Sequence, residues 1–137
     1  MSIDKVSHIG IAVKSIDDRI KFYQDSLGLK STKTEVVEEQ KVKVAFLELE
    51  NMRLELVEPT SKESSIAKFI DKRGEGIHHI AFEVRDIEEV FLNMRKAGIR
   101  ILGDSVSKGA HGSKVFFTHP KDTGGILMEF VEEVENG

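Results

Sequence analysis

The stretches Ser7-His-Ile-Gly-Ile-Ala-Val13 and His78-His-Ile-Ala-Phe-Glu-Val84 decide the fold of this chain. They align residue by residue, with His8 over His79 and Val13 over Val84. Each alternates between a strongly apolar face and a face that holds the histidine, which is the two-residue period of a β-strand. The chain therefore reads as two copies of one module, each opening with a strand.

The likeness of the two halves continues beyond the opening strands. Leu27-Gly-Leu29 aligns with Ala97-Gly-Ile99, and Leu54-Glu-Leu-Val-Glu58 aligns with Met128-Glu-Phe-Val-Glu132. Capping-box spacing starts a helix after each opening strand, and a glycine ends it. We therefore expect the order strand, helix, strand, strand, strand in each half.

These patterns predict a single domain over residues 1–137, built from a first βαβββ module at about 5–58, a linker helix within about 59–75 and a second module at about 76–134. The later strands are expected at about 33–37, 42–49, 52–58, 101–106, 114–118 and 126–133, with a short helix at about 64–72. The fold class is α+β, in which the two paired modules form a curved, mostly antiparallel sheet around a cleft.

The composition limits the possible partners. The net charge is −4, which argues against nucleic acid as the main partner. No apolar run approaches the length that spans a bilayer, and the first residues lack the apolar stretch of a signal peptide, so no membrane contact is expected. The chain has no cysteine, which excludes disulfides and thiolate metal sites and is compatible with a cytoplasmic location.

Four residues recur at matching places in the two modules. His8 and His79 lie on the opening strands, and Glu55 and Glu129 lie on the closing strands. A lone strand histidine is usually a half-buried structural side chain, and duplication alone can preserve one. Recurrence of both residue types in register nevertheless favours a shared role. Pairing the modules about a local twofold axis would bring the four together in a metal-binding cleft.

Two imidazoles and two carboxylates suit a borderline divalent cation such as Co²⁺, Mn²⁺, Ni²⁺ or Zn²⁺. A purely structural zinc site would normally use cysteine in a closed shell. The ligand set therefore favours a catalytic ion.

Two glycine-containing loops precede and follow the strand expected at 114–118. One carries Lys108 and His111, and the other carries Lys121. Tight-turn chemistry alone explains much of their composition. The functional interpretation is that these side chains and the loop N–H groups bind an acyl or phosphate group at the rim of the cleft.

With these residues in place, the chain resembles the vicinal oxygen chelate superfamily and, within it, the methylmalonyl-CoA epimerase family. The resemblance covers nearly the whole length. The segments that carry it are His8-Ile-Gly-Ile-Ala-Val13, Leu54-Glu-Leu-Val-Glu-Pro59, Ile66-Ala-Lys-Phe-Ile70, Gly76-Ile-His-His-Ile-Ala81, Lys108-Gly-Ala-His-Gly112, His119-Pro-Lys-Asp122 and Gly125-Ile-Leu-Met-Glu129. The first marks only the superfamily, whereas the His-His strand together with the last three loops and strands is more specific.

The resemblance implies that His8, Glu55, His79 and Glu129 bind a divalent metal, with cobalt the first choice. It also implies a homodimer that acts on an acyl-CoA. The reaction would be epimerisation of (R)- and (S)-methylmalonyl-CoA, by removal and return of the C2 proton through a metal-stabilised enolate. Lys108, His111 and Lys121 would hold the CoA part.

The acid/base groups are less closely defined by the resemblance. Glu129 is the first candidate, followed by Glu55 and Glu48. Some family members carry glutamine at the Glu55 position, so this site is one charge more negative. Some bacterial members place a carboxylate at a position that aligns with Val44, and Glu48 lies on the same strand face but further along.

Two alternative functions use the same fold, and a third, a ring-cleaving iron dioxygenase, is disfavoured because it needs two histidines and one carboxylate with access for O₂, and four ligands crowd such a site. A glyoxalase I-like lactoylglutathione lyase would use the same ligands to move a proton next to a carbonyl, but on a glutathione adduct. A non-catalytic small-molecule-binding protein of the superfamily would need no metal. The four-residue set counts against the second alternative, and only the substrate separates the first from an epimerase.

Overall fold

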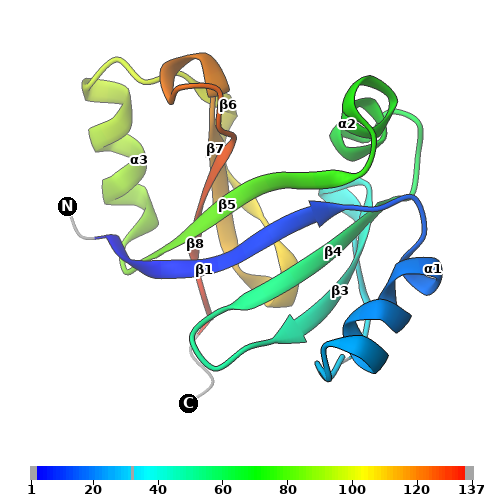
Figure 1. Ribbon diagram of the computed structural model, residues 1–137. Coiled ribbons are helices and arrows are strands. Elements are labelled where there is room, and N and C mark those ends of the chain that lie inside the picture. The colour runs from blue at the N-terminus through cyan, green and yellow to red at the C-terminus, as the bar shows by residue number, and fades with distance from the viewer. Residues whose placement is uncertain (1–2, 32, 135–137) are drawn as a thin grey trace. The chain divides into compact units, whose positions relative to one another are not determined.

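The computed structural model describes residues 3–31 and 33–134 (Figure 1). The elements of the first module are β1 (Ile3–Ala12), α1 (Ile16–Lys21), β2 (Glu35–Val37), β3 (Val42–Glu48) and β4 (Arg53–Pro59). Helix α2 (Ser65–Arg73) follows, and the second module contains β5 (Gly76–Val84), α3 (Ile87–Lys96), β6 (Ile101–Lys108), β7 (Lys114–Thr118) and β8 (Met128–Glu132). The α+β class and the βαβββ order expected for each module are confirmed.

The chain forms two compact units whose boundaries fall inside strands. One unit is formed by residues 8–78, and the other by residues up to 7 together with those from 79 onwards. The beginning of β1 therefore belongs with the later part of the chain. Among its contacts there, Lys5 Nζ lies 3.6 Å from Glu83 Oε2, Arg85 donates to Asp4 at 3.2 Å, and Ser7 donates to Glu133 at 3.0 Å.

The strand order is β2-β3-β4-β1 in the first module and β5-β8-β7-β6 in the second. In each, the opening strand runs parallel to the closing strand, and the other neighbours are antiparallel. The register is also duplicated, because Gly10 lies opposite Glu55 and Ala81 lies opposite Glu129. The alignment of the two halves at sequence level therefore corresponds to an equivalent pairing of their strands.

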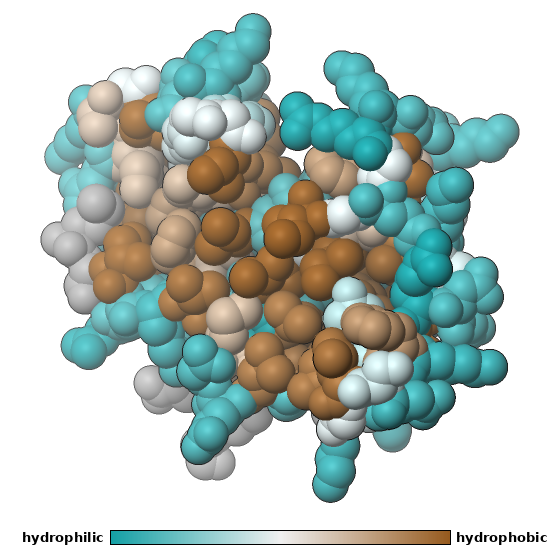
Figure 2. All heavy atoms as spheres, viewed as in Figure 1, coloured by the Kyte–Doolittle hydropathy of each residue, from teal (hydrophilic) through white to brown (hydrophobic). Residues whose placement is uncertain are grey.

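One face of each four-stranded set is covered by a helix. In the first, Val13, Ile16, Ala45, Leu47 and Leu56 form a buried core to which α1 contributes. In the second, a larger core that includes Ile87, Phe91, Phe116 and Phe130 lies against α3. The outward side of α1 is hydrophilic, and hydrophilic side chains project in that region of Figure 2. Strand alternation leaves the histidines and their glutamates on the face opposite these cores.

A duplicated glutamate attaches each helix to its closing strand. Glu58 Oε1 accepts a hydrogen bond from the backbone N–H of Ile16 at 2.8 Å, and Glu132 Oε1 accepts one from that of Ile87 at 3.1 Å. Both contacts satisfy an N–H at a helix start that has no partner within the helix. The sequence pattern indicated the capping residues Ser15 and Asp86, which accept from residues three positions later, but it did not indicate these glutamates.

The first helix differs from its expected form. Its α-helical part ends at Lys21, and a π-helical turn occupies Phe22–Ser26. The N–H of Leu27 donates to the carbonyl of Phe22 at 3.3 Å, which is the five-residue step of a π-turn.

None of the helices in the described residues has the length and apolar character that a membrane span requires.

Asp122 offers a pH test of the fold. Its carboxylate accepts hydrogen bonds from the backbone N–H and the guanidinium of Arg100 at 2.9–3.1 Å, and these contacts lower the pKa of Asp122 from 3.8 to about 2. A lowered folded-state pKa stabilises the protein above the unfolded pKa, and this stabilisation is lost as the pH falls through the folded value.

We therefore expect Asp122→Asn to lower the urea midpoint near neutral pH. The gap between parent and variant should close between about pH 4 and pH 2. Urea unfolding followed by circular dichroism measures both effects. Asp104→Asn, which changes an exposed carboxylate on β6, is the control and should leave the midpoint unchanged. A gap that stays constant with pH would contradict the role given to Arg100.

Candidate metal centre

The unit of residues 8–78 holds one buried histidine–glutamate pair. His8 lies on β1 and Glu55 on β4, and their side chains share a face because Glu55 is opposite Gly10 in the parallel register. His8 Nδ1 lies 3.2 Å from Glu55 Oε2. His8 is 4% exposed and Glu55 is 5% exposed, so a charge on either is shielded from water.

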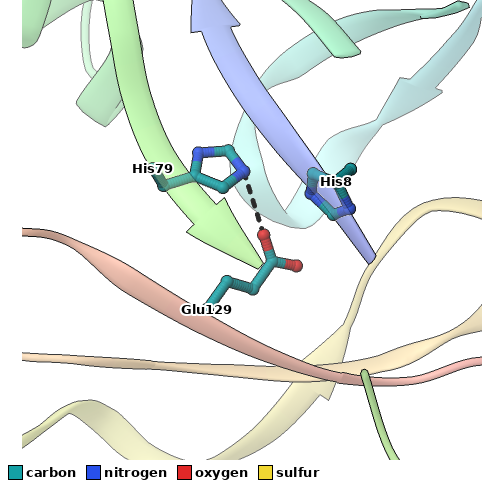
Figure 3. A group of neighbouring side chains, drawn as sticks. All are labelled: His8, His79 and Glu129. Carbon is teal, nitrogen blue, oxygen red and sulfur yellow. Dashed lines mark ion pairs between the residues drawn. The ribbon is translucent and has the colours of Figure 1, made fainter. Parts of the chain in front are cut away.

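The other unit holds an equivalent pair. His79 lies on β5 and Glu129 on β8, and Glu129 is opposite Ala81. His79 Nε2 lies 3.1 Å from Glu129 Oε1, as the dashed line in Figure 3 marks. Both residues are buried. The same two residue types thus meet on equivalent strands of both modules, which is the duplication that the sequence indicated.

The surroundings of the two pairs differ in chemistry. The ring of His79 meets Phe117 edge to face at a centroid distance of 5.9 Å, and Ala81, Val115 and Val131 are buried beside Phe117. In the first unit, Glu55 Oε2 also accepts a hydrogen bond from Arg53 Nε at 3.0 Å. Burying a carboxylate is costly unless it is paired, and in each unit the imidazole provides a partner.

The residue types fit a divalent cation. His8, His79 and Glu129, which Figure 3 draws together, are buried, and each offers one ligand atom of the kind that holds a metal ion. Imidazole nitrogen and carboxylate oxygen are ligands for borderline first-row cations. The chain has no cysteine to form the closed thiolate shell of structural zinc. The donor set is therefore suited to a catalytic ion.

The other residues indicated by the sequence lie on exposed parts of the two units. Glu48 is exposed at the end of β3, opposite Arg53 in the register. Lys108 and His111 are exposed before β7, and Lys121 is exposed after it. Since a strand advances about 3.3 Å per residue, β7 separates the two loops by its own length. They do not form one cluster of cations.

His111 has an unusual backbone. Its φ is +57°, in the left-handed region that costs energy for most residues other than glycine, and Gly112 follows with φ +71°. Ser113 stabilises the turn by donating from its hydroxyl to the carbonyl of Ala110 at 2.7 Å. The Gly-flanked loop thus has a defined turn structure.

The sequence pattern does not single out Arg53. Because it stands two residues before Glu55 on the same strand, alternation places both on one face. That spacing was visible in the sequence. A basic residue on a strand edge is so common, however, that it carries little information before the partner carboxylate is known to be buried.

The comparisons with known proteins agree with this fold. Residues 7–117 match the model of the Glyoxalase/Bleomycin resistance protein/Dioxygenase superfamily, and the chain belongs to that superfamily.

Within it, the chain is similar to the ethylmalonyl-CoA/methylmalonyl-CoA epimerase of Cereibacter sphaeroides, with 38% identity over 93% of this chain and 96% of that protein. It is also 37% identical to the human mitochondrial methylmalonyl-CoA epimerase, over 93% of this chain and 73% of that protein. A solved structure of a variant Streptomyces coelicolor methylmalonyl-CoA epimerase in complex with 2-nitronate-propionyl-CoA superposes with a TM-score of 0.94, at 38% identity over 97% of this chain and 96% of that one.

Adjacent histidines on β5 allow a matched test of metal binding. His79 is buried against Glu129, whereas the ring of His78 contacts Phe69 at a centroid distance of 5.0 Å. We expect His79→Ala to weaken Co²⁺ binding by about 100-fold or more, because an inner ligand is lost. His78→Ala should change it by no more than about threefold. Isothermal titration of metal-free protein with Co²⁺ measures both. Equal losses in the two variants would remove His79 from the ligand set.

Proposed function

We propose that this chain is a metal-dependent epimerase that interconverts (R)- and (S)-methylmalonyl-CoA. The observation that carries the proposal is the pair of buried histidine–glutamate contacts on duplicated strands. Support comes from the similarity of almost the whole chain to methylmalonyl-CoA epimerases. The substrate is an acyl-CoA whose C2 proton lies between a thioester and a carboxylate.

The four buried residues His8, Glu55, His79 and Glu129 are proposed to hold one divalent ion. Cobalt is the first choice, and manganese, nickel and zinc suit the same ligands. When bound, such an ion would act as a Lewis acid that favours negative charge on the thioester oxygen.

The proposed reaction removes a proton from C2 and returns a proton to it, so substrate and product have the same atoms and charge. A carboxylate accepts the C2 proton, and a proton then returns to the opposite face of the same carbon. We assign the first transfer to Glu129, which approaches His79 at 3.1 Å in a buried, partly aromatic setting. Burial excludes most water from the carboxylate, so few water molecules compete with Glu129 for the substrate proton.

The second acid/base group is proposed to be Glu55 or Glu48. Glu55 is buried beside His8, whereas Glu48 is exposed at the end of β3. Burial favours Glu55 as a ligand, and exposure lets Glu48 exchange its proton with solvent. Glu48→Gln with normal exchange would leave Glu55 as the second group.

The CoA part is proposed to contact the exposed side chains of Lys108, His111 and Lys121. The two loops lie at opposite ends of β7, so they would contact different parts of an extended molecule rather than one phosphate. A homodimer and a cytoplasmic location are also proposed. The dimer rests on the resemblance to the epimerase family, and the location rests on the absence of cysteine.

Hydrogen exchange at C2 tests the proposed activity directly. The protein is incubated with methylmalonyl-CoA in D₂O, with and without Co²⁺, and loss of the C2 proton signal is followed by NMR. We expect rapid loss only with metal, and a fall of about 100-fold or more in Glu129→Gln, because removal of the base raises the barrier to proton abstraction.

The same preparation is assayed with the glutathione hemithioacetal of methylglyoxal. Turnover of that adduct without C2 exchange would replace the proposal with a lactoylglutathione lyase. Tight binding of an acyl-CoA by metal-free protein, without exchange, would replace it with a binding protein.

A further inference from the structure

We infer that Arg53 is a positioning residue that acts through Glu55, by offsetting the charge of that carboxylate. Its effect is to make a metal-loaded site one charge more positive toward an anionic substrate. The inference deepens the proposed function and rests on it.

The contacts of Glu55 carry the inference. Arg53 Nε donates to Glu55 Oε2 at 3.0 Å, and His8 Nδ1 lies 3.2 Å from the same oxygen. The side chain of Arg53 is 18% exposed and that of Glu55 is 6% exposed. A charge pair this close and this shielded interacts far more strongly than one on the open surface.

The fold holds the guanidinium in place. Arg53 and Glu55 are two residues apart on β4 and therefore point to the same face. The register pairs Arg53 with His8 on β1, and the guanidinium carbon lies 6.0 Å from the ring centroid of the fully buried Phe46. An aromatic face favours a cation at this distance. Arg53 is thus positioned by a strand, a ring and a carboxylate.

In the described residues of the other half, the position two before the carboxylate does not carry a cation. Aligning Glu55 with Glu129 places Leu127 at the position of Arg53. An apolar residue therefore stands two positions before the second carboxylate. Duplication conserved the histidine–glutamate pairs, but the two halves differ at this neighbouring position. The asymmetry assigns charge compensation to the first half.

The charges of the proposed ion and its ligands show what the guanidinium contributes. Two carboxylates cancel the charge of a divalent ion when both imidazoles are neutral. The proposed substrate already carries a carboxylate and gains further negative charge on its thioester oxygen as the C2 proton leaves. A site of zero net charge would attract such a substrate weakly. The charge of Arg53 makes the loaded site one unit more positive than it would be without the guanidinium.

A charge-rescue experiment separates this role from simple packing. In Arg53→Gln, we expect kcat/KM for C2 exchange to fall about tenfold or more, mainly through a higher KM for the anionic substrate, because the loaded site loses one positive charge. Co²⁺ affinity should stay the same or increase, because a cation near the ion has been removed. In Glu55→Gln, Co²⁺ affinity should fall about tenfold, because a negative ligand has been lost.

The double variant Arg53→Gln with Glu55→Gln decides the question. It restores the charge balance of the parent, so KM for methylmalonyl-CoA should recover to within about threefold to fivefold of the parent value, a non-additive result that only interacting residues give. Loss of an acid/base group at residue 55 would lower kcat instead. Arg53→Lys keeps the charge and should retain most of the activity. Thermal unfolding of every variant confirms that it is folded.

Arg19→Gln is the matched control, since Arg19 makes an exposed two-atom contact with Glu75 at 2.7–3.2 Å in the same unit. It should alter neither Co²⁺ affinity nor kcat/KM. A double variant whose KM is no lower than that of Arg53→Gln, or a loss of Co²⁺ affinity in Arg53→Gln, would overturn the role of Arg53 while leaving the proposed function intact. A parent protein that binds no Co²⁺ would overturn both.

Discussion

The parallel pairing of the opening and closing strands is the constraint on which the rest depends. It sets Gly10 opposite Glu55 and Ala81 opposite Glu129, so that in each module a small residue lies beside the carboxylate. The histidine that stands two positions before this small residue can then approach the glutamate to about 3 Å. A shift of one residue in this register would turn the glutamates toward the helix-covered cores. The register of these strands therefore determines which side chains lie together on the face of the candidate site.

Each closing strand performs two tasks on its two faces. Its first glutamate meets a histidine, and a second glutamate three positions later accepts from the start of the helix on the opposite face. An odd spacing puts two side chains on opposite faces of a strand. The strand that carries the candidate ligand is therefore also the strand that attaches the helix. The position of the ligand and the packing of the core are linked through one short segment.

Much of this arrangement follows from the sequence because duplication made it visible. Two-residue alternation gave the opening strands, and capping residues gave the helix starts at Ile16 and Ile87. The equivalence of His8 with His79 identified the residues that the fold buries. Contacts that depend on distant backbone were not visible, such as Glu58 at the N–H of Ile16, because no local rule links them. The π-helical turn after Lys21 was not visible either. A single turn with one extra residue hardly changes the spacing of apolar residues by which a helix is predicted.

The division of β1 between the two units bears on how such a chain could arise. Residues 3–7 are held by Glu83, Arg85 and Glu133 of the later half, whereas the rest of the strand pairs with β4 of the earlier half. A half-length ancestor would have had the same divided strand but no second copy within its own chain. Its strand end would have needed a neighbouring molecule, as in strand exchange between identical subunits. Gene fusion would then have turned an association that depended on concentration into an intramolecular one.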